Sequence, residues 1–446
     1  MARPEGNQQN QIVVNSGRCA IGPQESTRAS IRIDGGRVTH ILSDPSLLPT
    51  HRGDCPEIDL GGFLIMPGLI NAHDHLEFAL FPRLANPPHR NYIDWGTAIH
   101  NKFPDVIAKH RAVSKDLRLW WGGIRNLLCG ATTVSHHNPL WPELQREDFP
   151  VRVVQEYGWG HSLALGGDLR VARSATPEGR AFIVHACEGV DEEALEELWG
   201  LDRLGLLDAS AVLVHGLAID REGIALMRER RTSLIVCPSS NNFLFGKLPD
   251  MSLLCKIDNV ALGNDSPLTA EGDLLDEIRF AMRFCSIPPQ VAYRMVTEAP
   301  AAILRLEDAV GSIRVGGTGD LIAVRDTDQN AADRLETLSM MDVEFVMIAG
   351  RVQLASETIF ERLPLPVKQG LEPLWIDGTV RWLRAPVKEL LQKTEEVLGK
   401  AEVRLGGKTV RIPAPGRSDI LHSTADCSAA TRNDIRRANK ILIRAS

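Results

Sequence analysis

The sequence lacks a long apolar run. No stretch approaches the ~18 apolar residues that a transmembrane helix requires, and the start, "MARPEGNQQNQ", is polar where a signal peptide would be apolar. Both absences argue against a membrane protein and against secretion. We therefore expect a soluble protein of the cytoplasm.

The sequence also lacks an excess of positive charge and any CxxC pair. Its 50 Lys and Arg against 57 Asp and Glu give a net charge of −7, so no basic surface for nucleic acid or an anionic membrane is expected. The eight scattered cysteines favour free thiols in a reducing compartment. With 43% hydrophobic and 24% charged residues, the composition is that of a globular enzyme, for which we expect a small-molecule substrate.

Short apolar stretches alternate with segments of helical spacing through the middle of the chain. Uninterrupted apolar strands are expected where helices cover both faces of a parallel sheet. The pattern predicts a (β/α)8 TIM-type barrel over residues 63–309. Its eight strand candidates, of which "SLAL" is the weakest, are 63–70, 131–134, 151–157, 162–165, 181–184, 211–214, 233–236 and 259–263.

Hairpin patterns lie on both sides of this region. "ASIRIDGGRVTHILSD" (29–44) alternates apolar and polar residues around a Gly-Gly turn, and "GSIRVGGTGDLIAVRD" and "VEFVMIAGRVQLAS" have similar patterns. We expect residues 1–62 and 310–360 to form one small β-sandwich domain. Residues 361–446 are expected to form a helical and irregular extension, with an amphipathic helix in "VKELLQKTEEVLGKA" and a polar segment over 415–440 that is a solvated tail or a partner contact.

Polar residues follow most of the predicted strands. His73 and His75 end the first strand two residues apart, so they point to the same side of it. Others follow later strands: His136 and His137, His185, His215 and Asp265. In a barrel of this kind the carboxyl ends of the strands meet at one mouth. We therefore expect a metal site there, although an HxH pair alone would equally suit two surface histidines.

Five motifs follow one another in a fixed order: "PGLINAHDH", "HACEG", "VHGLAID", "CPSSN" and "LGNDSP". In these motifs the chain resembles the amidohydrolase superfamily, specifically its cytosine-deaminase-like and chlorotriazine-hydrolase-like branch, from about residue 10 to residue 355. The resemblance implies that the metal ligands are His73, His75, His185 and Asp265. It also implies that Glu188 and His215 are the acid–base pair around an activated water.

The chemistry of these residue types agrees with that assignment. Three imidazoles and one carboxylate suit zinc, and iron is also possible. Asp265 can both bind the metal and accept a proton from the water. Glu188, three residues beyond His185, can protonate a ring nitrogen or a departing amine. Its alternative role is that of an acid favoured by a helix N-terminus. His215 would stabilise the developing oxyanion.

The number of metal ions depends on an absent lysine. Two-metal members of the superfamily bridge their ions with a carboxylated lysine after the fourth strand, and this chain has no lysine between Ala131 and Val184. Glu156 is the one substitute, and a substrate contact or a structural hydrogen bond suits it better. We therefore predict a single divalent metal ion.

Substrate specificity is expected in the loops that follow the strands. The stretch from Leu76 to about Lys115 is expected to cover the mouth, with Trp95 either stacking on the substrate or packing inside the protein. The other candidates for substrate contact are His136, His137, His161 and Asn241.

The predicted function is hydrolytic deamination of an amino-heterocycle or an amidine-like small molecule. An amidase, a lactonase or a dechlorinase on the same barrel is the alternative, and a catalytically inactive binding module is a third. We expect a homo-oligomer, with a dimer as the simplest form.

Overall fold

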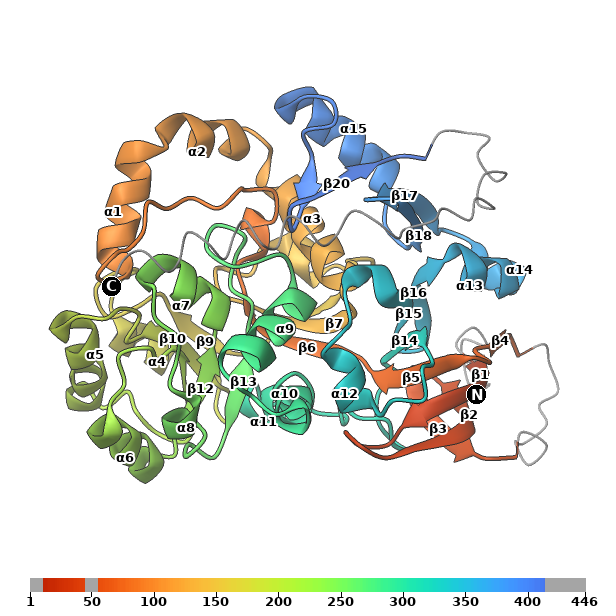
Figure 1. Ribbon diagram of the computed structural model, residues 1–446, viewed down its shortest axis with the longest axis horizontal. Coiled ribbons are helices and arrows are strands. Elements are labelled where there is room, and N and C mark those ends of the chain that lie inside the picture. The colour runs from red at the N-terminus through yellow and green to blue at the C-terminus, as the bar shows by residue number, and fades with distance from the viewer. Residues whose placement is uncertain (1–10, 45–54, 414–446) are drawn as a thin grey trace, which may run out of the picture. The chain divides into compact units, whose positions relative to one another are not determined.

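The computed structural model describes residues 11–44 and 55–413 (Figure 1). Eight short parallel strands lie in two sheets, in the orders β6-β7-β8 and β13-β12-β11-β10-β9. Their bounds are β6 Leu69–Asp74, β7 Ala131–His136, β8 Arg152–Val153, β9 Gly158–Gly160, β10 Phe182–Ala186, β11 Ala211–His215, β12 Ser233–Val236 and β13 Val260–Leu262. This parallel β/α architecture is of the TIM-barrel type.

No strand ladder joins the two parallel sheets within the described residues. The last and first strands nevertheless meet, because the backbone N–H of Asp265 donates to the carbonyl oxygen of His73 at 3.1 Å. The carboxyl ends of β6 and β13 are thereby held next to each other.

Helices connect and cover these strands. The first three are α1 Tyr92–Lys102, α2 Pro104–Arg111 and α3 Lys115–Leu128. Those of the remaining parallel region are α4 Leu169–Ser174, α5 Glu192–Arg203, α6 Arg221–Arg230, α7 Pro238–Phe245, α8 Met251–Leu254, α9 Leu274–Phe284, α10 Pro289–Met295 and α11 Glu298–Ile303. Side-chain capping by Asp191, Asp220 and Asp273 starts α5, α6 and α9.

The structure corrects the prediction at two of the strands. The stretch 63–70 is not one strand: it divides at Gly68, where a side chain would collide with Thr132, and only β6 belongs to the parallel region. Residues 162–165 are not a strand, and β9 at 158–160 takes that place. Leu163 and Leu165 are 37% and 43% exposed, so the apolar letters of "SLAL" do not mark a buried strand.

Both ends of the chain contribute to one 12-stranded sheet (Figure 1). Its order is β19-β20-β17-β18-β16-β15-β14-β5-β1-β2-β3, with β4 paired to β1. The bounds are β1 Gln11–Ala20, β2 Ser26–Asp34, β3 Arg37–Leu42, β4 Glu57–Asp59, β5 Phe63–Pro67, β14 Leu321–Arg325, β15 Val343–Ile348, β16 Arg351–Ser356, β17 Glu372–Ile376, β18 Thr379–Leu383, β19 Arg404–Leu405 and β20 Lys408–Arg411.

Two of the three predicted hairpins are present in this sheet, although a two-layer sandwich stays a prediction. Gly35 and Gly36, with φ of 57° and 81°, make the turn between β2 and β3, and β15 pairs antiparallel with β16. In the "GSIRVGGTGDLIAVRD" segment only β14 is a strand. The segment expected to be helical and irregular also supplies four strands, β17 to β20, with β18 paired to β16.

The helices of the later part of the chain are α12 Ala331–Leu335, α13 Glu357–Arg362, α14 Leu365–Lys368 and α15 Val387–Leu398. The predicted amphipathic helix is α15, and the indole Nε1–H of Trp121 in α3 donates to Thr394 Oγ1 in α15 at 2.8 Å. The segment 415–440 lies outside the described residues.

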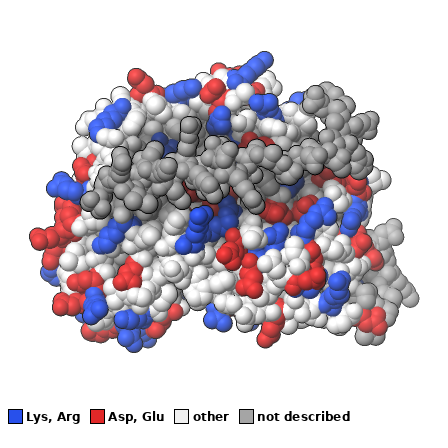
Figure 2. Space-filling view, viewed as in Figure 1, with Lys and Arg blue, Asp and Glu red and all other residues white. Residues whose placement is uncertain are grey.

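Two further features are the distribution of charged side chains on the surface and the length of the apolar helices. Figure 2 shows acidic and basic side chains interspersed over the described residues of one face. Among the helices of residues 11–44 and 55–413, none combines the length and apolarity needed to cross a bilayer.

Candidate active site

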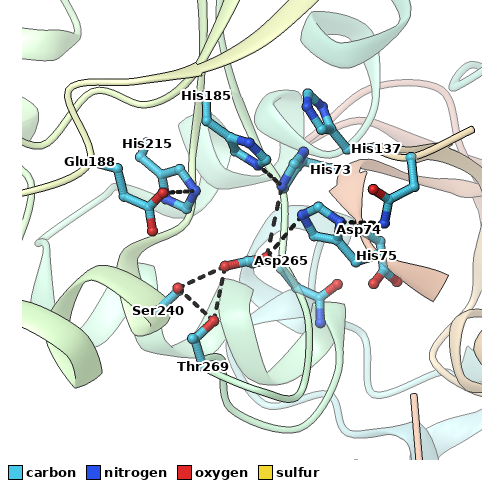
Figure 3. A network of polar contacts seen from close by, with 12 residues as sticks. His73, Asp74, His75, His137, His185, Glu188, His215, Ser240, Asp265 and Thr269 are labelled. Carbon is cyan, nitrogen blue, oxygen red and sulfur yellow. Dashed lines mark hydrogen bonds and ion pairs between the residues drawn. The ribbon is translucent and has the colours of Figure 1, made fainter. Parts of the chain in front are cut away.

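Three histidines converge where two parallel strands end (Figure 3). His73 is in β6, His75 lies just beyond it, and His185 is in β10. One nitrogen from each lies within 4.8 Å of the others, and the Nε2 atoms of His73 and His185 are 3.2 Å apart. The alternation of side chains along β6 places the first two on the same side.

Asp265, which follows β13, completes this group. Its Oδ1 lies 3.8 Å from His73 Nε2 and 3.7 Å from His75 Nε2. All four side chains are buried. Three nitrogen donors and one carboxylate oxygen at these separations fit a divalent cation such as zinc.

The histidines are held in the neutral form that coordination requires. Burial and the neighbouring histidines lower the pKa of His73, His75 and His185 well below the ordinary value. The Nδ1 of His185 lies 2.9 Å from the carbonyl oxygen of His161, an acceptor, so Nδ1 carries the proton. The lone pair of His185 Nε2 therefore faces the other ligand candidates.

Two hydroxyl groups orient the Asp265 carboxylate. Ser240 Oγ and Thr269 Oγ1 donate to its Oδ2 at 2.8 and 2.9 Å, which leaves Oδ1 facing the histidines. Sequence reasoning missed both residues. The signal for Ser240 was its place in the "CPSSN" motif, whereas Thr269 is outside every motif that was recognised.

Glu188 and His215 face each other beside the metal candidates. Glu188 Oε2 lies 3.5 Å from His215 Nε2, and burial, reinforced by the charge of Asp265, raises the pKa of Glu188 well above the ordinary value. Glu188 precedes the N-cap of α5, and Glu192 and Glu193 occupy the first turn instead. The alternative role of Glu188 as a helix-start acid therefore does not fit its position.

Asn241 sets the orientation of His215. Its Oδ1 lies 3.0 Å from His215 Nδ1, so the Nδ1–H donates and Nε2 is free to face the reacting groups. Burial lowers the pKa of His215, which keeps it neutral. Asn241 was expected to touch the substrate, and the structure instead places it behind His215.

A cavity of about 240 Å³ opens next to these groups. Its polar lining includes His75, His185, Glu188, His215 and Asp265. Its apolar wall includes Phe78, Phe81, Trp95, Ile99, Ile107 and Leu268, and its remaining polar lining includes Tyr92, His100, Arg111 and His161. Helices α1 and α2, within the segment expected to cover the mouth, contribute to this wall.

The expected substrate contacts divide into two groups. Trp95 and His161 line the cavity, and the indole Nε1–H of Trp95 also donates to the carbonyl oxygen of Leu84 at 2.8 Å. His136 and His137 do not line it. The His136 Nε2 lies 3.3 Å from Glu77 Oε2, and the His137 ring packs 4.1 Å from the His185 ring.

Glu156 is exposed to solvent, whereas the metal-ligand candidates are buried. Its side chain is 63% exposed and forms an ion pair with Arg180. Of the two roles expected for it, the ion pair fits a structural contact, and Glu156 does not line the cavity beside the metal candidates.

The chain is similar to known amidohydrolases. The model of the amidohydrolase family matches residues 161–353. A 5-methylthioadenosine/S-adenosylhomocysteine deaminase from Caldanaerobacter subterraneus is 25% identical over 392 residues, which cover 72% of this chain and 88% of that protein. A similarly named deaminase 2 from Archaeoglobus fulgidus is 24% identical over 373 residues, covering 72% and 86%.

Solved structures show the same fold. A zinc-bound adenosine deaminase from Xanthomonas campestris matches with a TM-score of 0.61 at 18% identity, over 86% of this chain and 97% of that one. Zinc-complexed atrazine chlorohydrolase from Arthrobacter aurescens matches with a TM-score of 0.64 at 16% identity, over 87% and 100%. The family match over residues 161–353 and these relatives confirm that the chain resembles the amidohydrolase superfamily.

Proposed function

We propose that the protein is a zinc-dependent hydrolytic deaminase of an amino-heterocycle, and that adenosine-like compounds are its substrate class. One observation carries the reaction type: a buried Glu188, with a pKa raised well above the ordinary value, faces the cavity beside the three histidines. A neutral carboxylic acid at this position can give its proton to a ring nitrogen or a departing amine. The names of the similar deaminases support the substrate class.

The reaction replaces the amino group of a ring carbon with oxygen from water and releases ammonia. When bound by His73, His75, His185 and Asp265, a divalent cation would supply Lewis acidity that makes the attacking water acidic. Asp265 accepts the first proton from that water. Glu188 donates its proton to the ring nitrogen beside the reacting carbon. The proton held by Asp265 then passes to the amino group, which leaves as ammonia, and the second proton of the water returns to Glu188 as the keto product forms.

His215, oriented by Asn241, would hold the attacking water. Because Asn241 engages Nδ1 of His215, the opposite nitrogen can accept a hydrogen bond from the water and fix its direction. Such preorganised polar groups in a site that excludes bulk water lower the barrier to reaction.

The cavity favours a small, flat substrate. Its volume of about 240 Å³ is below the ~300–1,000 Å³ of sites for drug-sized ligands. Phe78 and Trp95 offer aromatic surface for a heterocycle, and Glu188 and three of the ligand candidates, His75, His185 and Asp265, line the same cavity. A ring bound against the aromatic side chains would bring its amino group within reach of Glu188.

A hydrogen bond between strand ends supports a proposal about the barrel. We propose that β6 to β13 form a single (β/α)8 barrel, since the Asp265 N–H reaches the His73 carbonyl oxygen across the gap between the sheets. The site would then lie at the carboxyl ends of its strands, as is usual for this fold.

Ammonia release from a substrate panel tests the reaction. The zinc-loaded protein would be offered adenosine, 5-methylthioadenosine, S-adenosylhomocysteine, aminopyrimidines, aminotriazines, cyclic amides and lactones. Ammonia from an amino-heterocycle, with the matching keto product, is the expected result. Turnover of an amide, lactone or chlorinated ring without ammonia would favour the alternative hydrolases, and binding without turnover of any compound would favour an inactive module.

A further inference from the structure

Asp74 lies between two metal-ligand candidates but points away from them. The alternation of β6 turns its side chain from the mouth toward α3. There the Nη2 of Arg125 donates to both carboxylate oxygens at 2.7 Å, and Asn126 Nδ2 donates to Oδ2 at 2.6 Å. The side chains of Asp74 and Arg125 are 0% and 1% exposed, so this ion pair is fully buried.

Arg125 also reaches the loop that carries Asp265. Its Nη2 lies 3.4 Å from the backbone oxygen of Asp265, and its Nη1 donates to the carbonyl oxygen of Gly272 at 3.0 Å. A second link is formed by Asn71, whose Nδ2 donates to Asn264 Oδ1 at 2.6 Å and whose Oδ1 accepts from the Asn264 N–H at 3.2 Å. The ligand-bearing ends of β6 and β13 are therefore joined through one buried polar network.

We propose that Asp74 and Arg125 are positioning residues that set the distance between the His73–His75 pair and Asp265, and thereby the affinity for the cation. The proposal rests on the proposed metal site. A buried ion pair adds little net stability compared with apolar side chains of the same volume, so stability alone is a weak reason for one here. Asp74 lies between His73 and His75 in the chain, and Arg125 Nη2 lies 3.4 Å from the backbone oxygen of Asp265, so the pair links the segments that carry three of the four ligand candidates. Supporting residues of this kind tune metal sites.

Zinc affinity and thermal stability, measured together, test the proposal. The first site variant is Asp74→Asn, which removes the negative charge and keeps the shape of the side chain. The second is Arg125→Lys, which keeps the positive charge but removes the planar guanidinium group that makes several hydrogen bonds at once. The matched controls are Asp326→Asn and Arg18→Lys, which break an ion pair of 2.6 Å whose side chains are 14% and 10% exposed and which joins β1 to the turn after β14. Zinc Kd is measured by competition with a chromophoric chelator, and Tm is measured with and without zinc.

The expected result separates the two pairs. Both site variants should raise the zinc Kd by about 10- to 100-fold, the usual cost of losing a partner that supports a metal ligand. The controls should lower Tm but leave the zinc Kd within about twofold of the native value, because a pair outside the supporting network has no such effect. A smaller zinc-induced rise in Tm should accompany the weaker binding in the site variants alone.

Other outcomes overturn the proposal. Site variants with a lower Tm and an unchanged zinc Kd would make the pair a purely structural one, as would failure of both variants to fold even with zinc present. Equal losses of zinc affinity in the controls would show a general effect of stability. If the native protein itself bound no zinc, the proposed function would fail first, and this is seen before any variant is made.

Discussion

Replacing Glu188 by Gln is the most direct test of the proposed chemistry. The substitution keeps the shape of a side chain that is 8% exposed and removes only the transferable proton. Glu188 lies beside His215 and does not belong to the group of metal-ligand candidates. The metal content of the variant should therefore stay native. Loss of a general acid–base should lower kcat by about 10²- to 10⁴-fold, or roughly 2.7 to 5.5 kcal/mol of barrier.

The assay is ammonia release at saturating substrate, with zinc content measured on the same samples. Glu192→Gln is the matched control, because it removes an exposed acid from the first turn of α5 and should leave kcat unchanged. The native pH profile should fall as pH rises through the raised pKa of Glu188, since the acid form is the active one, and the Gln variant should lose that limb. Near-native turnover in Glu188→Gln would refute the proton-donor role.

Three further predictions concern the metal site. Elemental analysis should find about one zinc or iron ion per chain, because three histidines and a carboxylate form one site. Glu156→Ala should leave that metal content unchanged. Two tightly bound ions would contradict the single-metal assignment. His185→Ala should lose both metal and activity, whereas His215→Ala should keep most of its metal and lose turnover; an equally empty site in both would make His215 a ligand. Ser240→Ala combined with Thr269→Ala should raise the zinc Kd by about 10- to 100-fold, because Asp265 loses both hydroxyl partners; unchanged affinity would show that the strand end alone orients the carboxylate.

The sequence was sufficient for features that depend on local periodicity. Continuous apolar stretches identified β7, β10, β11, β12 and β13 to within a few residues, because strands buried on both faces need no polar positions. It failed at β9, whose "GWG" has no apolar run. A side chain at Gly158 would collide with Thr176, and one at Gly160 would displace Leu169, and such contacts are a property of the folded chain.

The candidate ligands were predictable because each follows an apolar strand, whereas the direction of a side chain was not. His136 and His137 are neighbours in "HHN", yet one contacts Glu77 and the other packs against His185, so neither lines the cavity. Asn241 reaches the site only through His215. Whether a residue touches substrate or supports another residue depends on tertiary contacts that strand spacing does not contain.

The backbone conformation at the strand ends helps to set the direction of the site side chains, and residue identity alone does not predict it. His215 and Asp265 have φ of 76° and 54°, in the left-handed region that a side chain disfavours. Such conformations cost about 1–3 kcal/mol each and persist where surrounding contacts determine them. The Asn241 amide holds His215, and the Ser240 and Thr269 hydroxyls hold Asp265. These polar partners therefore offset local strain in order to aim an imidazole and a carboxylate at one point, and a substitution among them should disturb the site more than it disturbs the fold.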